Sequence, residues 1–280
     1  MKRHYLLDLV RGLGAIAVVH FHSGVLWNVM PYGYLAVDLF FGLSGYVMAM
    51  TYEQRLKDGM RLWPFLRARL ARLYPVYLIG IVLGLAVIAA KAAAGREVPT
   101  LWAIPLNAIM LPAPVSGDFF PVDVPDWSLF FELIAYLLFG LLIARTSDSA
   151  LAAIVIAAVI VLHGHIPNAG SSWAEFPIGL ARLGLAFPIG VLLWRCGWQP
   201  PALPTMLLPL ATFLGDVSYP LYIIHYPLLS PWEMSCRKLD VHGPAAALPF
   251  TVIAVAIAAL ISRRNVRNDQ IHKRDPGLST

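Results

Sequence analysis

Residues 5–27 read YLLDLVRGLGAIAVVHFHSGVLW, and this apolar run decides the fold class. A helix that crosses the hydrocarbon core of a bilayer needs about 20 mostly apolar residues. The run is long enough, and only Asp8, Arg11 and two histidines give it ionisable side chains. We therefore interpret it as an uncleaved membrane-spanning helix, because Asp8 and Arg11 interrupt the apolar core that a signal peptide needs.

The ionisable residues of this run follow the period of a helix. At 100° per residue, Arg11 and His22 lie about 20° apart around the axis, and Asp8 lies about 60° and 40° from them. His20 lies about 180° from Arg11, on the opposite face. Ionisable groups in a bilayer usually face a protein interior or a watery cavity where they function. The spacing predicts one inward stripe of an acid, a guanidinium and an imidazole.

The composition places the chain among integral membrane proteins. Of its 280 residues, 59% are hydrophobic and 13% are charged, against about 25% charged in a soluble domain. The net charge is +5, but the basic residues cluster beside apolar runs, as the positive-inside rule requires. We therefore expect the lipid bilayer, and no nucleic acid, as a partner.

Eight segments have the length and apolar character of a span. They are 5–27, 34–50, 73–91, 127–144, 149–164, 177–194, 205–230 and 245–262. The segment 99–112 is apolar but short and contains three prolines, so we interpret it as an interfacial or re-entrant piece rather than a ninth span. The sequence predicts an all-α polytopic transmembrane bundle of about eight spans, with eight to ten as the range. The expected domains are a membrane domain, 1–262, and a basic tail, 263–280.

Lysine and arginine predict the orientation of the bundle. The N-terminus, the segment 51–72 and the tail are basic, whereas the segment 113–126 contains three aspartates and no basic residue. With eight spans, both termini and the 51–72 segment lie in the cytoplasm, and the acidic segment lies outside. In this topology Cys196 and Cys236 lie on opposite sides of the membrane and do not pair.

Three further spans carry polar or small residues at helical spacing. One has Ser128, Glu132 and Tyr136, another has Ser218, Tyr222 and His225, and a third has Asp38, Gly42, Gly45 and Ala49. Such stripes either pack helices together or line a functional cavity. We favour packing for the glycine and alanine stripe and function for Glu132. For His225 both interpretations remain open, and Pro220 and Pro227 predict a bend that opens backbone carbonyls nearby.

The basic segment ends in two arginines that a helix places side by side. Arg69 and Arg72 are three residues apart, within FLRARLARLYPVYL. Guanidinium groups suit phosphate because they donate in pairs, but a basic helix end can equally anchor on anionic lipid. The spacing alone leaves both interpretations open.

Five runs resemble the membrane-bound acyltransferase 3 family, in the family's order. The first contains Arg11, ten residues and then His22, as the family's opening motif does. The runs are LDLVRGLGAIAVVHFHSG (7–24), VDLFFGLSGYVMA (37–49), RLARLYPVY (69–77), PDWSLFFELIAYLLF (125–139) and GDVSYPLYIIHYPLL (215–229). The chain departs from the family in two respects. It is too short for the usual ten or so spans, and Glu132 is a single carboxylate where many relatives have adjacent ones.

The resemblance implies O-acylation with acyl-CoA, most simply acetyl-CoA, as the donor. Relatives acylate hydroxyls of polysaccharides, lipid-linked sugars or macrolide-type metabolites, so we expect a carbohydrate-containing acceptor and a place in the bacterial inner membrane. A hydroxyl nucleophile needs a base with a pKa near neutral, which imidazole supplies. We expect His22 to be this base, Glu132 to orient it, Arg11 to hold the donor or tune the site, and Arg69 and Arg72 to grip the phosphates of CoA.

The remaining candidates contact substrate in this interpretation, and no metal is expected. They are Asp38, Ser128, Tyr222 and His225. The sequence leaves open whether transfer is direct or passes through a covalent acyl intermediate. The rival class is an ion-coupled transporter, because intramembrane Asp, Arg and His also serve as proton relays. Transporters often contain internal repeats, and we find none in this sequence.

Overall fold

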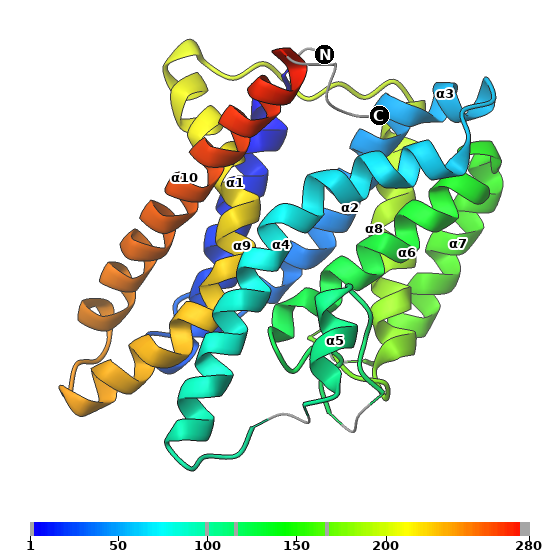
Figure 1. Cartoon of the computed structure of the whole chain (residues 1–280). Coiled ribbons are helices and arrows are strands. Elements are labelled where there is room, and N and C mark those ends of the chain that lie inside the picture. The colour runs from blue at the N-terminus through cyan, green and yellow to red at the C-terminus, as the bar shows by residue number, and fades with distance from the viewer. Residues whose placement is uncertain (1–2, 99–100, 115–116, 166–167, 275–280) are drawn as a thin grey trace.

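The computed structural model describes residues 3–98, 101–114, 117–165 and 168–274 as a bundle of helices (Figure 1). Within these ranges there is no β-strand, only an isolated bridge between Asp118 and Ser172. The α-helices are α1 (Tyr5–His22), α2 (Ala36–Met48), α3 (Gln54–Lys57), α4 (Leu62–Ala93), α5 (Ala103–Ala108), α6 (Trp127–Leu141), α7 (Asp148–Leu162), α8 (Phe176–Arg195), α9 (Leu208–Lys238) and α10 (Pro244–Arg274). The predicted all-α class is confirmed.

Seven helical stretches are long and apolar enough to cross a membrane. They are Tyr5–Val25, Gly33–Lys57, Leu62–Ala93, Val124–Leu141, Phe176–Arg195, Thr205–Lys238 and Pro244–Arg263. Each matches one of the eight predicted spans. The eighth prediction, 149–164, corresponds to α7, which has 15 residues and so rises only about 22 Å along its axis. A hydrocarbon core is about 30 Å thick, so α7 is shorter than an ordinary span.

The proline-rich segment 99–112 does not form a span in the residues described. The only helix among its described residues, 101–112, is α5, which is six residues long and contains Pro105. Pro99 lies outside the described residues, as do residues 275–280 of the predicted tail. Helix α10 continues past the expected boundary at residue 262 to Arg274, and its candidate span ends at Arg263.

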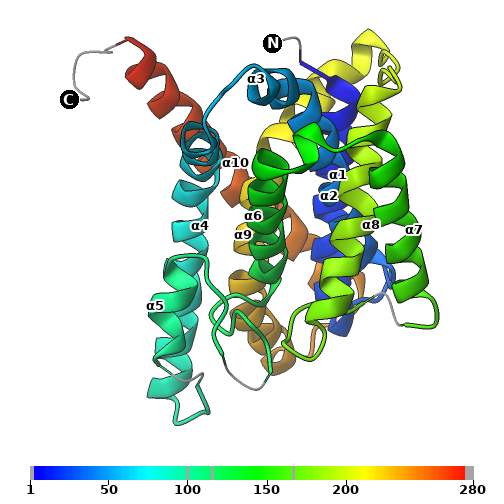
Figure 2. The ribbon, with the colours of Figure 1, turned by 90° about the vertical axis from the view of Figure 1, so that its right-hand side faces the viewer.

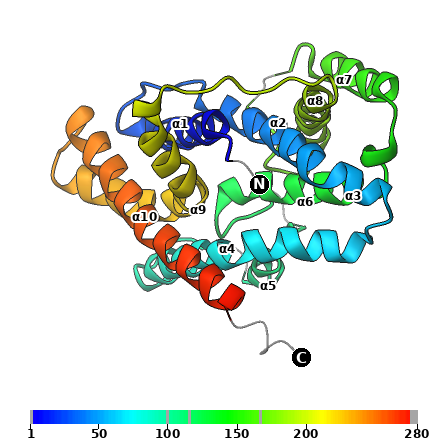
Figure 3. The same cartoon turned by 90° about the horizontal axis from the view of Figure 1, so that it is seen from above.

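The helices pack in two groups, which are joined by direct contact between α1 and α2 and through α6. On one side α1 lies along α9, which also contacts α4 and α10; on the other, α2 and α7 lie along α8 (Figure 3). Figure 2 shows α6 near the middle of the bundle, where it contacts α4 and α8. The first residues of α1, the last turns of α10 and the short helix α3 lie at one end of the bundle (Figure 1).

Glycines allow the closest of these helix contacts. A Cβ added at Gly190 of α8 would stand 2.0 Å from the carbonyl oxygen of Gly42 in α2. A Cβ added at Gly45 would stand 2.1 Å from the carbonyl oxygen of Phe187. The predicted small-residue stripe of α2 is therefore a packing surface for α8. Cys196 is exposed and Cys236 is buried, and neither forms a disulfide.

Candidate active site

The polar stripe of α1 faces α9, as the helical period predicts. The Arg11 guanidinium donates through Nε to Ser218 Oγ at 2.9 Å and through Nη2 to the Gly215 carbonyl at 3.2 Å. Asp8 accepts from Arg11 Nη2 at 2.8 Å. The helices come this close because residue 215 is a glycine: a Cβ there would lie 2.6 Å from Asp8 Cβ.

A second arginine completes the charge network at this end of α1. Arg3 Nε lies 2.5 Å from Asp8 Oδ2, and Arg3 Nη2 lies 2.7 Å from Asp216 Oδ1. Two carboxylates thus face two guanidinium groups, Arg3 and Arg11, and much of the charge is neutralised within the protein. The side chain of Arg11 remains 31% exposed, so it can still meet a ligand.

Two histidines meet at the other end of the stripe. His225 Nε2 lies 3.0 Å from His22 Nδ1, and the two ring centroids are 5.0 Å apart. His225 is fully buried, and its Nδ1 lies 2.6 Å from the Tyr222 carbonyl oxygen. His22 is only partly buried.

The bent course of α9 in Figure 1 agrees with the bend predicted from its prolines.

His20 has different surroundings, although it is only two residues from His22. Its Nε2 lies 3.4 Å from Thr251 Oγ1 of α10, and its ring packs edge-on against Trp27. The side chain is buried, and its Nδ1 has no hydrogen-bond partner in the described part of the chain. His20 therefore contacts α10 and Trp27, whereas His22 contacts α9.

Tyr222 and Ser128 connect α9 to the start of α6. Their hydroxyls lie 2.6 Å apart, and each lies 3.1 Å from the Pro125 carbonyl oxygen, so one hydroxyl donates to the other and the second donates to that carbonyl. Both side chains are buried. In this arrangement the two residues hold the segment of α9 that carries His225 against α6.

Glu132 hydrogen-bonds to neighbours other than His22. Its Oε1 accepts from Ser44 Oγ at 3.1 Å and from the Tyr136 hydroxyl. The partner at His22 Nδ1 is instead His225. The structure therefore does not bring Glu132 into hydrogen-bond contact with the imidazole that it was expected to orient.

Asp38 forms a partly buried ion pair with a residue that the sequence analysis missed. Arg182 Nε and Nη2 contact the two Asp38 oxygens at 2.9 and 3.0 Å. The same guanidinium donates to the carbonyls of Tyr34 and Ala169 and lies 5.2 Å from the Trp127 ring centroid. Arg182 is 2% exposed. An arginine inside a predicted span was the available signal for this ion pair.

Arg69 and Arg72 have different environments despite their spacing. Arg69 is buried, donates through Nη2 to the Tyr52 hydroxyl at 2.6 Å and lies 4.6 Å from the Tyr52 ring centroid. Arg72 is exposed and lies close enough to Arg11 for their charges to interact. Of the two, Arg72 is therefore the accessible one.

Two carboxylates from the acidic segment are buried rather than solvated. Asp123 and Asp126 are each 1% exposed, and none of their four carboxylate oxygens has a hydrogen-bond partner among the residues that the structure describes. Burial raises the pKa of Asp123 well above its usual range, and the neighbouring Asp126 carboxylate raises it further. A charge count along the sequence carries no signal for this burial.

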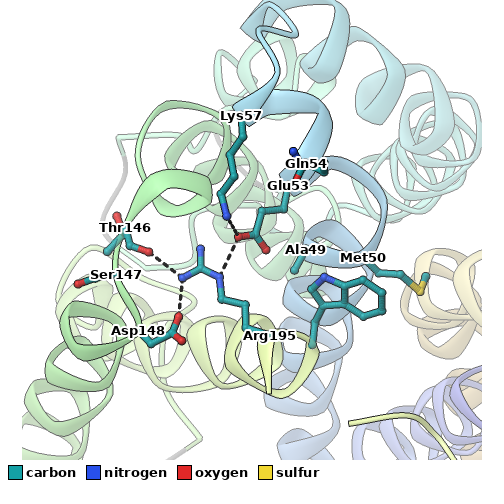
Figure 4. Close-up of a pocket in the computed structure, with 10 residues that line it drawn as sticks. Ala49, Met50, Glu53, Gln54, Lys57, Thr146, Ser147, Asp148 and Arg195 are labelled. Carbon is teal, nitrogen blue, oxygen red and sulfur yellow. Dashed lines mark hydrogen bonds and ion pairs between the residues drawn. The ribbon is translucent and has the colours of Figure 1, made fainter. Parts of the chain in front are cut away.

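Two cavities among the described residues lie away from the histidine pair. One, of about 620 Å³, lies beside α3, where Arg195 contacts Glu53 at 2.9 Å and Asp148 at 2.8 Å (Figure 4). Lys57 also contacts Glu53 at 2.5 Å, so the charges of this cavity largely neutralise one another. The other, of about 560 Å³, is an apolar groove between α6, α7 and α8. Among the described residues, no group of three or more His, Cys, Asp or Glu side chains is arranged to hold a metal ion.

Comparison with known proteins identifies the kind of domain that contains this site. The family profile described as "Acyltransferase domain" matches residues 4–205. "Protein 2 in picA locus" of Rhizobium radiobacter is 34% identical over 181 residues, which cover 58% of this chain and 94% of that protein. No solved structure matches the chain significantly.

Two further relatives have more informative names. "Exopolysaccharide production protein ExoZ" of Rhizobium meliloti (strain 1021) is 25% identical over 304 aligned positions, covering 88% of this chain and 94% of that protein. "Acyltransferase MdmB" of Streptomyces mycarofaciens is 31% identical over 187 residues, covering 63% of this chain and 44% of that protein.

Proposed function

Because the chain belongs to the acyltransferase domain family, we propose that it is an O-acyltransferase that takes an acetyl or other short acyl group from acyl-CoA. It is a multi-pass membrane enzyme that transfers groups other than amino-acyl groups. The proposed acceptor is a hydroxyl of a carbohydrate or of a carbohydrate-containing molecule. The protein would act in the bacterial inner membrane, with both termini in the cytoplasm.

The observation that carries this proposal is the position of His22. An imidazole with its Nδ1 held by His225 stands on the same face of α1 as Arg11, about 16 Å further along the helix. In the proposed step, His22 takes the proton of the acceptor hydroxyl as its oxygen attacks the thioester carbonyl. The carbon–sulfur bond breaks, and the proton passes to the CoA thiolate. General bases of this kind contribute about 10²–10⁴-fold to the rate.

Arg11 and Arg72 are suited to bind the phosphate end of acyl-CoA, which is the end opposite the thioester. Arg11 and Arg72 are both accessible and their charges interact, and Arg11 lies towards the end of α1 that is farther from His22. Guanidinium groups make strong charge-assisted hydrogen bonds to phosphate. We therefore place the phosphates of CoA near this pair and the thioester near His22. Arg69 would act indirectly, through its contact with Tyr52.

The acceptor class draws its support from one relative. The protein named for exopolysaccharide production aligns over 88% of this chain, and this favours a carbohydrate over a macrolide-type acceptor. Asp38, Ser128 and Tyr222 are partnered by protein groups, so in this proposal they shape the acceptor site rather than reach into it.

The decisive experiment incubates the purified protein with acetyl-CoA labelled in the acetyl group. We expect slow hydrolysis without an acceptor and transfer to an added oligosaccharide from a bacterial exopolysaccharide. The same protein in vesicles should show no counterflow of labelled sugar or ion. Counterflow without any cleavage of acetyl-CoA would support the transporter interpretation and refute the proposal.

A further inference from the structure

Two hydrogen bonds connect the histidines to the backbone of their own helices, and a third connects the two rings. His225 Nδ1 faces the Tyr222 carbonyl at 2.6 Å, and His225 Nε2 faces His22 Nδ1 at 3.0 Å. His22 Nδ1 also lies 3.2 Å from the carbonyl oxygen of Val18, one turn earlier in α1. The chain of contacts therefore begins at a carbonyl of α9 and ends at a carbonyl of α1.

The chemistry of these groups allows one arrangement of protons when both rings are neutral. A carbonyl oxygen only accepts hydrogen bonds, so His225 Nδ1 must carry its proton and His225 Nε2 must offer a lone pair. His22 Nδ1 faces this lone pair and a second carbonyl, so it must be the donor. A neutral imidazole has one N–H, which leaves Nε2 of His22 unprotonated.

The surroundings hold this arrangement in place. His225 is fully buried. Tyr222, whose carbonyl accepts from His225 Nδ1, is itself held in place because its hydroxyl contacts Ser128 Oγ and the Pro125 carbonyl. The Tyr226 ring packs edge-on against His22, with centroids 5.3 Å apart. Nε2 of His22 has no hydrogen-bond partner among the described residues, and it is not sealed from solvent.

We propose that His225 is the positioning residue of this site: it fixes His22 in the tautomer whose free Nε2 lone pair faces outward as the base. This inference rests on the proposed function and extends it to a residue 203 positions away in the sequence. When His22 Nε2 takes a proton from the acceptor hydroxyl, His22 becomes an imidazolium. The His225 lone pair then stabilises its Nδ1–H, the role that a carboxylate has in a catalytic triad.

The test compares two substitutions that differ in one property. The amide oxygen of His225→Gln can accept from His22 Nδ1–H, whereas His225→Leu has no acceptor. We expect His225→Leu to lower kcat by about 10²–10⁴-fold and to change the KM for acetyl-CoA by less than about threefold. His225→Gln should recover most of the lost turnover. His20→Leu, on the opposite face of α1, is the matched control and should remain within about threefold of the unchanged protein.

A spectroscopic readout separates positioning from packing. In protein with ¹⁵N-labelled histidine, the His22 signals, assigned by their loss in His22→Ala, should show Nδ1 protonated and Nε2 unprotonated at pH 8. His225→Leu should change this to a mixture or to the opposite tautomer, and His225→Gln should preserve it. A role in packing alone would lower thermal stability in both variants without changing the tautomer.

Each outcome decides a separate point. A proton on Nε2 of His22 in the unchanged protein would overturn the inference, and this measurement needs no variant to fold. Equal turnover in His225→Leu and the unchanged protein would also overturn it. If the expected tautomer changes appear in a protein that never cleaves acetyl-CoA, the proposed function fails while the pairing of the two histidines stands.

Discussion

At the scale of single residues, the two histidines of α1 provide the sharpest contrast. His22 contacts His225, whereas His20 lies against Thr251 and Trp27. We expect His22→Ala to lower acyl transfer by about 10²–10⁴-fold and His20→Ala to cost much less, mainly through packing. Arg11→Ala should resemble His22→Ala in severity. Turnover of the three variants is compared at equal membrane abundance; loss of activity in His20→Ala alone would refute the assignment.

The two arginines of α4 should have effects of different kinds. Arg72 is exposed, so Arg72→Ala should raise the KM for acetyl-CoA by about tenfold or more, the loss expected for one charge-assisted phosphate contact. Arg69 is buried against Tyr52, so Arg69→Ala should mainly lower the melting temperature. Initial rates over a range of acetyl-CoA and a thermal melt of each variant test this. An unchanged donor KM in Arg72→Ala would leave contact with lipid as its role.

The buried Asp123 predicts a dependence of stability on pH. Its raised pKa means that the folded state holds a proton that the unfolded state releases above about pH 4. The contribution of Asp123 to the free energy of unfolding is therefore most favourable below about pH 4, and it is lost as the pH rises towards the raised pKa. Asp123→Asn removes this loss and should raise the melting temperature at pH 8 but hardly at pH 4.5. Asp118→Asn, at an exposed position of the same segment, is the control. A lower melting temperature for Asp123→Asn at both pH values would contradict the prediction.

At the scale of elements, α8 contains a matched pair of glycines. A methyl group at Gly190 would stand 2.0 Å from a backbone oxygen of α2. Gly190→Ala should therefore separate α8 from α2 and lower the free energy of unfolding by about 1–3 kcal/mol or more. At Gly184 the nearest atoms, in α7, would lie 3.7 and 3.8 Å away, an ordinary contact. Gly184→Ala should therefore be neutral or slightly stabilising. Melting of the purified variants tests the difference, and equal melting temperatures would mean that α2 and α8 pack less closely than described.

At the scale of the whole molecule, the prediction concerns topology. The described residues of the acidic segment, 113–114 and 117–126, and the last turns of α10 lie at opposite ends of the bundle (Figure 1). Reporter domains fused at Gly117 and at the C-terminus should therefore report opposite sides of the membrane, with the C-terminus in the cytoplasm. Reports from the same side would mean that a predicted crossing is wrong, and α7 with its 15 residues would be the first to re-examine.

Local periodicity explains how much of the fold could be predicted from the sequence. Seven predicted spans match full-length candidate helices, because a run of about 20 apolar residues needs no information from elsewhere in the chain. The common face of Arg11 and His22 was also predictable, because eleven residues of helix turn three times plus about 20°. The length of α7 was harder to predict, because apolar content alone does not show where a helix ends.

Contacts between distant helices were decided only by the tertiary structure. The sequence singled out His22 and His225 separately, but nothing in their spacing shows that the two rings meet across α1 and α9. The same holds for the pairing of Asp38 with Arg182, the burial of Asp123 and the different environments of Arg69 and Arg72. Helical period places a side chain on a face, whereas its partner depends on which helices pack together and where glycines let them approach.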